Sequence, residues 1–506
     1  TAQGQGQDMS GPGYAWIYYA GDPDEPINPT LGVGAPGGNG YYVRQYIYQT
    51  VTSMSASQDA WYLQDKWQIT DNLLLQLGIR NDKFTNSNAD GNAFVIEKNQ
   101  WEPRIGATWD VFGDSSLKVY GNMGRYYLAL PQATGERAAG GSVYKYRYFT
   151  YTSIDENGIP GGLTLVPTTG DPNGDGYVSA NNEFGQSKDP ETVTSQNLKP
   201  QYQDEFIVGF DKTLGDNWVY GAKATYRSVG TVIDDMCDPR VTYAAIENAG
   251  YDPENYEYNG CFIMNPNQTN MYKFTGINGA PDIVVPADQA LHNYPDVQRD
   301  YYAFDFYLTH PFDGTWYGKV GYTFARSWGN AEGQVRSDIG QTDVSVTEDW
   351  DYWELMDHAR GYLANHRRHQ LKAYGAYQIT PELLVSGNML VQSGMPRNCL
   401  GYFGPDKTNP GGGYGPDYHW CRGVPSPPGK DMNPWTYRLD LGLKYSPAFA
   451  KGVKFGLDVF NVFDSQETLQ TVANRMAGPN VVSVDYNRPV FLQTPRTVRL
   501  SVSYDY

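Results

Sequence analysis

The sequence predicts an all-β protein, a transmembrane antiparallel β-barrel with long extracellular loops, on three observations. First, segments that alternate apolar and polar residues recur along the 506 residues. Second, the connections between them alternate between a few residues and tens of residues. Third, aromatic residues bracket the apolar faces at both ends, as Tyr437 and Tyr445 do. Short turns at one end of the strands and long loops at the other are typical of outer-membrane barrels.

Each predicted strand has one apolar and one charged face, because successive side chains of a strand point to opposite sides. In 453–459, for example, Val453, Phe455 and Leu457 alternate with Lys454 and Asp458. The segments run to about 9–13 residues, which is the length that a tilted strand needs to cross a bilayer. Charges that recur on one face, strand after strand, favour an enclosed watery lumen over the exposed face of a soluble sandwich. The predicted strands are 41–70, 72–84, 99–111, 115–127, 201–213, 217–229, 299–312, 315–328, 364–379, 382–394, 434–446, 452–463 and 495–506.

The strand count predicts only part of a barrel. Bacterial single-chain barrels have even counts and both termini in the periplasm, whereas about 13 strands are predicted here. Residues 1–40 are therefore expected to be an extracellular loop segment, and 41–506 the C-terminal portion of a barrel whose N-terminal part is missing or separate. Splitting 41–70 into a hairpin near Ser53–Ser57 is the alternative, and it would restore an even count. The long extracellular loops are expected at about 85–100, 128–200, 230–298, 330–363, 396–434 and 464–494.

Composition and charge agree with this class and exclude others. The chain has 42 Tyr, 12 Trp and 19 Phe together with 56 Gly, a composition that suits strands and turns. No run of about 18 apolar residues is present, so the sequence predicts no membrane helix. The net charge of −18 disfavours nucleic acid as a partner, because phosphate binding needs clustered Lys and Arg.

The four cysteines form two local pairs, Cys237 with Cys261 and Cys399 with Cys421, each within one long loop. They lack the C-x-x-C spacing of a zinc or redox site. We therefore expect two disulfides, formed in an oxidising compartment. Four unpaired thiols are the alternative.

One turn has the pattern that begins a calcium-binding loop. Residues 171–179 fit D-x-N-x-D-G-x-x-S, and Ca²⁺ prefers several oxygen ligands around such a sharp turn. Asn182 stands where the closing Glu belongs, and Glu183 lies one position further. A Gly- and Asp-rich turn without an ion is the alternative, and no cofactor is otherwise required. The candidate ligands of a structural Ca²⁺ are Asp171, Asn173, Asp175, Tyr177 and Ser179.

Two further clusters are given structural interpretations. The sequence favours a basic rim at the entry of a strand over a metal site for 366–369, because the two histidines have no carboxylate at ligand spacing. The acidic and aromatic stretch 348–358 is expected to form a short loop helix that packs on its neighbours, with a ligand cradle as the alternative. No nucleophile elbow, Walker loop or HExxH motif occurs, so the chain is not predicted to be an enzyme.

Several segments in order resemble the TonB-dependent outer-membrane receptors, in particular the Oar-like branch. The terminal strand ends on Tyr504 and Tyr506, a pattern similar to the signal that the outer-membrane assembly machinery recognises. Each motif alone is weak, but together they span almost the whole chain. The segments that carry the resemblance are 61–80, 102–106, 197–205, 393–396, 458–464 and 499–506.

The resemblance implies a barrel of about 22 strands closed by an N-terminal plug, in the outer membrane of a Gram-negative cell. It implies outer-membrane lipid as surroundings and the energy-coupling protein TonB as a partner, reached through the part that this chain lacks. The expected function is the uptake of an unidentified ligand. A structural or adhesive barrel without transport is the alternative, and an outer-membrane hydrolase comes last.

Overall fold

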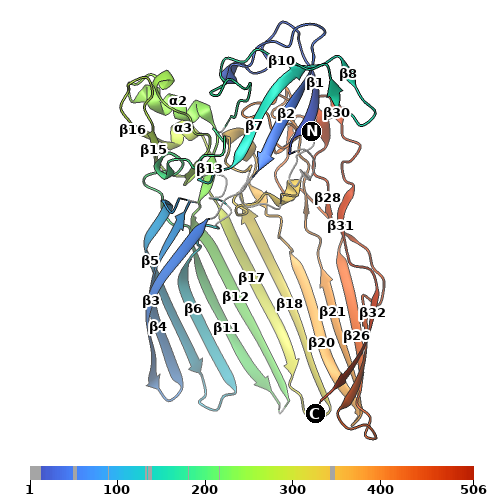
Figure 1. The fold of residues 1–506 in the computed structure, drawn as a ribbon. Helices are drawn as coiled ribbons and strands as arrows, with labels where there is room; N and C mark the ends of the chain where they lie inside the picture. Colours follow the sequence, from blue (N-terminus) through green and yellow to red (C-terminus); the bar gives the residue numbers. More distant parts are fainter. Residues whose placement is uncertain are drawn as a thin grey trace.

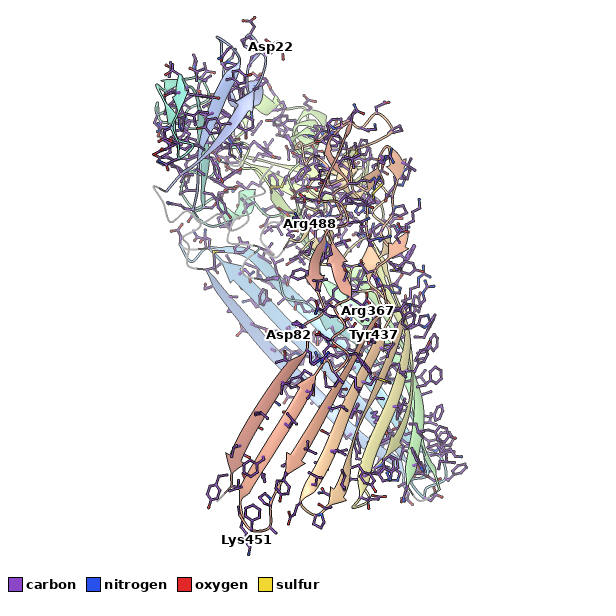
Figure 2. All side chains as sticks on the ribbon, turned by 90° about the vertical axis from the view of Figure 1, so that its right-hand side faces the viewer. Asp22, Asp82, Arg367, Tyr437, Lys451 and Arg488 are labelled. Carbon is purple, nitrogen blue, oxygen red and sulfur yellow. A yellow bond between two sulfur atoms is a disulfide. The ribbon has the colours of Figure 1, made fainter. Side chains whose placement is uncertain are left out.

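A computed structural model describes residues 13–505 except 50–53, 89, 132–133, 135–138, 181, 216 and 342–347. A wall of long, tilted strands fills one half of the molecule, and a layer of loops covers one end of it (Figure 1). Lys451 lies at the end of the wall that carries the tight turns, and Asp22 lies at the far end of the loop layer (Figure 2). No helix in the described part of the chain has the length and apolar character to cross a membrane.

The wall is a single antiparallel sheet of 14 strands, in which the long strands follow one another in chain order. The two-residue β19 (Gly361–Tyr362) pairs beside β18. The long strands are β3 (Ser55–Thr70), β4 (Leu73–Ser87), β5 (Ala93–Asp110), β6 (Leu117–Tyr127), β11 (Tyr202–Leu214), β12 (Trp218–Thr231), β17 (Arg299–His310), β18 (Trp316–Gly329), β20 (His369–Thr380), β21 (Leu383–Gln392), β26 (Thr436–Tyr445), β27 (Val453–Phe460) and β32 (Thr497–Tyr504).

The alternation of the sequence determines which face of the wall each side chain occupies. Leu441 and Leu457 belong to the exposed apolar face, whereas charged side chains meet across the strands on the other face. Arg125 lies 2.8 Å from Asp204, and Lys223 lies 3.3 Å from its direct cross-strand neighbour Asp305. Further pairs join Lys118 to Asp211, Arg227 to Glu205 and Arg499 to Asp458. The charged faces predicted from the sequence therefore form a network of cross-strand ion pairs.

The tight turns at one end are held by aspartate side chains. Asp110 accepts hydrogen bonds from the amides of Gly113 and Ser115, at 3.1 and 2.8 Å. Asp313 accepts from the amides of Thr315 and Trp316, at 2.8 and 3.0 Å. Asp side chains that bond to amides a few residues onward stabilise such turns, which explains why the short connections predicted from the sequence hold.

Two predictions about the first strands are wrong. The segment 41–70 is neither one strand nor a hairpin, because β2 (Tyr41–Gln49) pairs with β1 (Ala15–Ala20) and β7 (Val143–Thr150) in the loop layer. The first strand of the wall is β3. The expected long loop at 85–100 is instead the short connection 88–92, since β4 and β5 continue past the predicted strand ends.

The wall is open between β3 and β32, the two strands at its edges. Both strands are exposed along their whole length, including the apolar Leu63 and Leu500. In the other long strands most residues are half-buried or buried between two neighbours. Within the described residues, the sheet is therefore a curved wall and not a closed barrel.

The loop layer consists of small sheets and short helices. Its largest sheet has the order β1-β2-β7-β10, with β10 at Thr164–Leu165. The two-stranded sheets are β8–β9 (Ser153–Ile154, Pro160–Gly161), β13–β14 (Asp234–Met236, Phe262–Met264), β15–β16 (Asn270–Phe274, Ile283–Ala287), β22–β25 (Pro396–Arg397, Asp431–Met432), β23–β24 (Trp420–Cys421, Val424–Pro425), β28–β31 (Thr468–Thr471, Pro489–Leu492) and β29–β30 (Met476–Gly478, Val481–Val482). The helices are α2 (Pro239–Asn248), α3 (Gln289–His292), α4 (Trp353–Met356) and the 3-10 turns η1 (Pro29–Leu31), η2 (Pro190–Thr192), η3 (Pro253–Asn255) and η4 (Ser337–Ile339).

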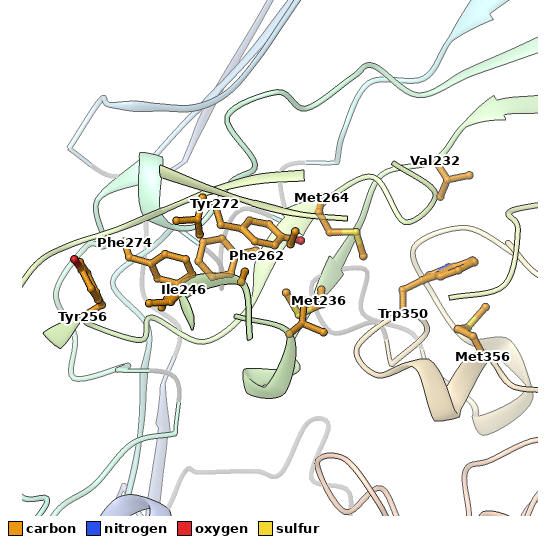
Figure 3. Packing of buried hydrophobic residues seen from close by; sticks show 14 of the residues in the cluster. Val232, Met236, Ile246, Tyr256, Phe262, Met264, Tyr272, Phe274, Trp350 and Met356 are labelled. Atoms are coloured by element: carbon orange, nitrogen blue, oxygen red, sulfur yellow. The ribbon is translucent and has the colours of Figure 1, made fainter. Parts of the chain in front are cut away.

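The loop layer has a hydrophobic core of its own, which joins two long loops (Figure 3). Tyr272, Phe262 and Met236 from the first loop are buried in the same cluster as Trp350 from the second. The Tyr272 hydroxyl is satisfied by Nε2 of His292, at 3.0 Å. Burial of aromatic side chains with their polar atoms bonded indicates a packed, ordered layer.

Candidate ligand-binding site in the loop layer

One side of the candidate site is formed by the sheet β1-β2-β7-β10 of the loop layer. Tyr144 and Tyr146 come from β7 and Arg44 from β2. The Arg44 guanidinium lies 5.2 to 5.7 Å from the ring centres of Tyr19, Tyr46 and Tyr146. Cation–π contacts of this kind fix the orientation of an arginine.

The opposite side of the site surrounds the disulfide between Cys237 and Cys261. The Tyr258 hydroxyl donates to the carbonyl of Cys237 at 3.0 Å, and the Cys237 amide donates to the carbonyl of Asp351 at 3.2 Å. The Tyr414 hydroxyl donates to the Asp351 carboxylate. Three loops that are distant in sequence are thereby joined at one place.

Ion pairs of Arg240 with Asp238 and Glu354 join the elements on this side of the site. Arg240, in the first turn of α2, bonds to the carboxylates of Asp238 and Glu354, with its two terminal nitrogens 2.8 and 2.9 Å from the oxygens of Glu354. Both carboxylates are almost fully buried. A guanidinium that binds a carboxylate through two parallel hydrogen bonds is geometrically specific, so the bridge fixes α2 against α4.

Between these two sides of the site lies a cavity of about 740 Å³. Its lining is rich in tyrosine and in acidic side chains, with fewer cationic ones. This size falls within the range of small-molecule binding sites. The tyrosines are Tyr144, Tyr146, Tyr243, Tyr258, Tyr352 and Tyr414, the acidic residues are Glu183, Asp235, Glu348 and Asp351, and the cationic residues are Arg44 and Lys188.

Burial changes the titration of acidic groups beside the cavity. Burial and the nearby Asp235 raise the pKa of the fully buried Asp234 well above its ordinary value. Burial also raises the pKa of Asp349 to about 7, although the Arg336 guanidinium lies 3.5 Å away and opposes the shift. A crowd of carboxyls in one small volume keeps some of them protonated near neutral pH.

The turn predicted to bind calcium lies next to this cavity. Ser179 lines the cavity and donates to the carbonyl of Tyr144 at 2.7 Å. The Asp171 carboxylate accepts from the amides of Asn173, Gly174 and Gly176, the first two at 2.8 and 2.9 Å. Asp175 bonds to the Tyr177 amide at 3.2 Å. The turn is thus held by its own amides, and a bound calcium ion stays a prediction.

The remaining predicted residues fall into separate places. Cys399 and Cys421 form the second disulfide, elsewhere in the loop layer. Tyr504 ends β32, and Tyr506 lies outside the described residues. Asp235 and Asp351 lie close to Cys237 and Cys261, but sulfurs joined in a disulfide supply no thiolate for a metal.

Two clusters from the sequence have clear structural roles. Within 348–358 the short helix α4 forms and packs on its neighbours, while Glu348, Asp351 and Tyr352 also line the cavity. His366 is buried and accepts from the Ser327 amide at 3.2 Å. Burial and the nearby Arg368 lower the pKa of His366 to about 4, so it is neutral at physiological pH. Within the basic rim predicted for 366–369, Arg368 is an exposed cation, whereas His366 carries no charge.

A wall of strands with one apolar and one charged face, joined by tight turns at one end and long loops at the other, is typical of outer-membrane β-barrels. Residues 4–229 match the family described as TonB dependent receptor-like, beta-barrel. Over 475 residues, or 86% of the chain, the sequence is 27% identical to the TonB-dependent transporter Oar of Myxococcus xanthus. Both matches show that the chain is similar to TonB-dependent receptors and transporters. The family resides in the outer membrane of Gram-negative bacteria.

The chain covers only part of the proteins it resembles. It spans 39% of the length of Oar. The siderophore receptor PiuA of Acinetobacter baumannii is 13% identical, with a TM-score of 0.43 over 92% of this chain and 44% of its own. The outer membrane transporter YddB of Escherichia coli is 12% identical, with a TM-score of 0.45 over 97% of this chain and 59% of its own.

If the 171–179 turn binds calcium, chelation should increase proteolytic cleavage within 160–190, because an ion with several oxygen ligands rigidifies its loop. Asp171→Asn should be cleaved to the same extent with and without chelator. The control is Asp155→Asn, since Asp155 holds a similar turn by accepting from the amides of Asn157 and Ile159. Limited proteolysis with mass spectrometry measures both. Cleavage that chelation leaves unchanged in the wild type would contradict the prediction.

The raised pKa of Asp349 predicts a loss of stability as the pH rises. An aspartate whose pKa is higher in the folded protein binds a proton that the unfolded chain has already released between about pH 4 and pH 7. The free energy of unfolding should therefore fall through that window. The upper limit of the fall is on the order of 1.4 kcal/mol per pH unit. Asp349→Asn should flatten this dependence. Urea midpoints of both proteins at pH 5 and pH 8 measure it, and equal slopes for the two would contradict it.

Proposed function

We propose that this chain provides part of the barrel wall and the loop layer of a TonB-dependent outer-membrane transporter. The transporter takes up an unidentified ligand. The position of the cavity carries this proposal. It lies in the loop layer beyond the strand ends of a wall with one apolar face and one face of ion pairs. A ligand caught there would stand at the mouth of a hydrated passage. The matched relative, which is called a transporter, supports the same conclusion.

The two disulfides support an extracellular position for the loop layer. Both lie in that layer. Disulfides form and persist outside the reducing cytoplasm, and at the cell surface they stabilise long loops. The tight turns at the other end of the wall would then face the periplasm, as in other outer-membrane barrels.

The cavity lining supports a ligand that carries cationic groups, hydroxyls or aromatic rings. The lining contains six tyrosines and four acidic residues, compared with two cationic residues. Tyrosine supplies a flat apolar face and a hydroxyl, while carboxylates attract cations. A peptide, a glycan or a cation-bearing compound fits this chemistry better than a bare anion does.

The exposed edges of the wall support a partner segment. In a hydrocarbon layer, the unpaired amides and carbonyls of β3 and β32 would have no hydrogen-bond partner, and such open edges do not occur in membranes. We therefore propose that further strands pair with both edges and close the barrel. The family resemblance implies that this segment also holds the plug and contacts TonB.

Energy-dependent uptake through the cavity is the first test. Cells that produce the complete protein should deplete at least one compound from a defined medium, as measured by untargeted mass spectrometry. A protonophore should stop the depletion. Ala180→Trp should reduce it severalfold, because Ala180 lines the cavity and an indole would occupy it.

The matched control is Ala249→Trp, which places the same side chain on an exposed loop alanine outside the cavity lining. It should leave depletion unchanged at equal surface abundance. Depletion that resists the protonophore would argue against transport. Depletion that Ala180→Trp leaves intact would exclude this cavity as the entry site.

The partner segment predicts the mass of the purified particle. Extracted in mild detergent, the barrel should be heavier than the 506-residue chain alone, by a polypeptide long enough for several more strands. Native mass spectrometry before and after denaturation distinguishes a continuous chain from a separate piece. A stable monomer with the mass of these 506 residues would overturn the proposal.

A further inference from the structure

The apolar face of the wall carries a furrow lined by small side chains. Ala107, Gly121, Val208 and Ala224 are direct neighbours across β5, β6, β11 and β12. The furrow encloses about 560 Å³ and continues to Phe304 on β17. A space of this size on a wall that faces hydrocarbon has to be filled by apolar groups.

Two rows of large side chains form the banks of the furrow. On the side of the turns the row contains Trp109, Phe210 and Phe306. On the other side the rings of Phe206 and Tyr226 are stacked, with centres 6.3 Å apart, and the ring of Tyr302 stacks on Tyr226 at 4.9 Å. Stacked rings make a rigid bank, so the furrow is a fixed feature of the surface.

The stacked bank leads to a cationic group. Arg326 on β18 lies directly opposite Tyr302 and belongs to the same outward face. Its guanidinium is 4.4 Å from the ring centre of Trp328 and 5.8 Å from that of Tyr362. The Arg368 guanidinium lies 5.2 Å from the same Tyr362 ring and donates to the Tyr362 hydroxyl. Two arginines are thereby presented around one tyrosine.

These arginines are exposed, and within the described residues neither forms an ion pair with a carboxylate. Asp300, a carboxylate on the same face, accepts from Gln298 at 2.6 Å and from the Tyr226 hydroxyl at 3.3 Å. On a chain with a net charge of −18, two cations without carboxylate partners on the apolar face stand out. Their charge is available to an anion from outside the chain.

The position of Arg326 and Arg368 along the strands indicates what kind of anion they could meet. Arg326 and Arg368 lie near the loop-side ends of β18 and β20, and neighbouring Arg367 is seen where the strands meet the loop layer (Figure 2). At the opposite ends of the strands His310 stacks on Trp316, and Trp218 contacts both rings edge to face. Aromatic girdles mark the two membrane interfaces. The arginines therefore lie at headgroup level, and the furrow lies in the hydrocarbon below them.

We propose that this surface binds a phosphorylated membrane lipid of the leaflet on the loop side, with its phosphate at Arg326 and Arg368 and an acyl chain in the furrow. The planar guanidinium matches phosphate oxygens and forms charge-assisted hydrogen bonds with them. The binding needs membrane insertion alone, so it holds whether or not the protein transports a ligand.

Native mass spectrometry of the complete protein in detergent tests this lipid site. The probe is a diphosphorylated, acylated glucosamine disaccharide, and its dephosphorylated form is the comparison. The wild type should retain one equivalent of the phosphorylated lipid. The double variant Arg326→Gln/Arg368→Gln should bind it at least about tenfold more weakly, because both charge-assisted contacts with the phosphate are lost.

Arg475→Gln/Arg488→Gln is the matched control, since these arginines lie in the loop layer and Arg475 also contacts a tyrosine ring, 4.7 Å away. It should retain the lipid. Equal binding of the dephosphorylated lipid, or an undiminished affinity of the Arg326→Gln/Arg368→Gln protein, would overturn the headgroup assignment. Complete displacement by inorganic phosphate would identify a plain phosphate site instead of a lipid site.

The furrow is tested separately. Ala224→Phe fills it with an apolar side chain that the hydrocarbon tolerates, and it should reduce lipid retention severalfold. Ala222→Phe places the same ring on the same strand, in the row of the turn-side bank and outside the furrow lining, and should have little effect. Equal retention by the two variants would overturn the acyl-chain assignment.

Discussion

The structure depends on strands with one apolar face and one charged face, the pattern of strands that meet hydrocarbon on one side and water on the other. That arrangement is stable only if backbone groups pair along the sheet and charges on the wet face neutralise one another. Cross-strand pairs such as Lys223 with Asp305 and Arg499 with Asp458 meet the second requirement. The first holds for every strand that has two neighbours. It does not hold along the outer edges of β3 and β32, the two strands that have one neighbour each within the described residues.

Alternation predicted the strands of the wall well because each is constrained on both faces. It could not predict which sheet a strand joins. Tyr41–Gln49 is rich in aromatic and β-branched residues, as strands are, yet it pairs with β1 and β7, and side-chain periodicity carries no information about pairing partners. The connection 88–92 was missed because 93–98 continue β5 beyond its predicted start.

The candidate site was only partly predictable. Its disulfide, Ser179 and the acidic stretch at 348–352 stood out in the sequence, since cysteine spacing and charge runs are local patterns. Tyr144, Tyr243 and Tyr414 did not, because a tyrosine in a chain with 42 of them marks nothing by itself. Those side chains acquire a role only when hydrogen bonds such as that of Tyr414 to Asp351 bring distant loops together.

Charge is distributed between two surfaces in a way that separates two kinds of ligand. Acidic side chains gather inside the loop layer, where Asp235 and Asp351 line the cavity and would repel an anion. The arginines at 326 and 368 lie outside the wall at the membrane interface, where they would attract one. Because the aromatic shelf of Trp328 and Tyr362 fixes the first of these cations, a lipid bound there would brace β18 against β19.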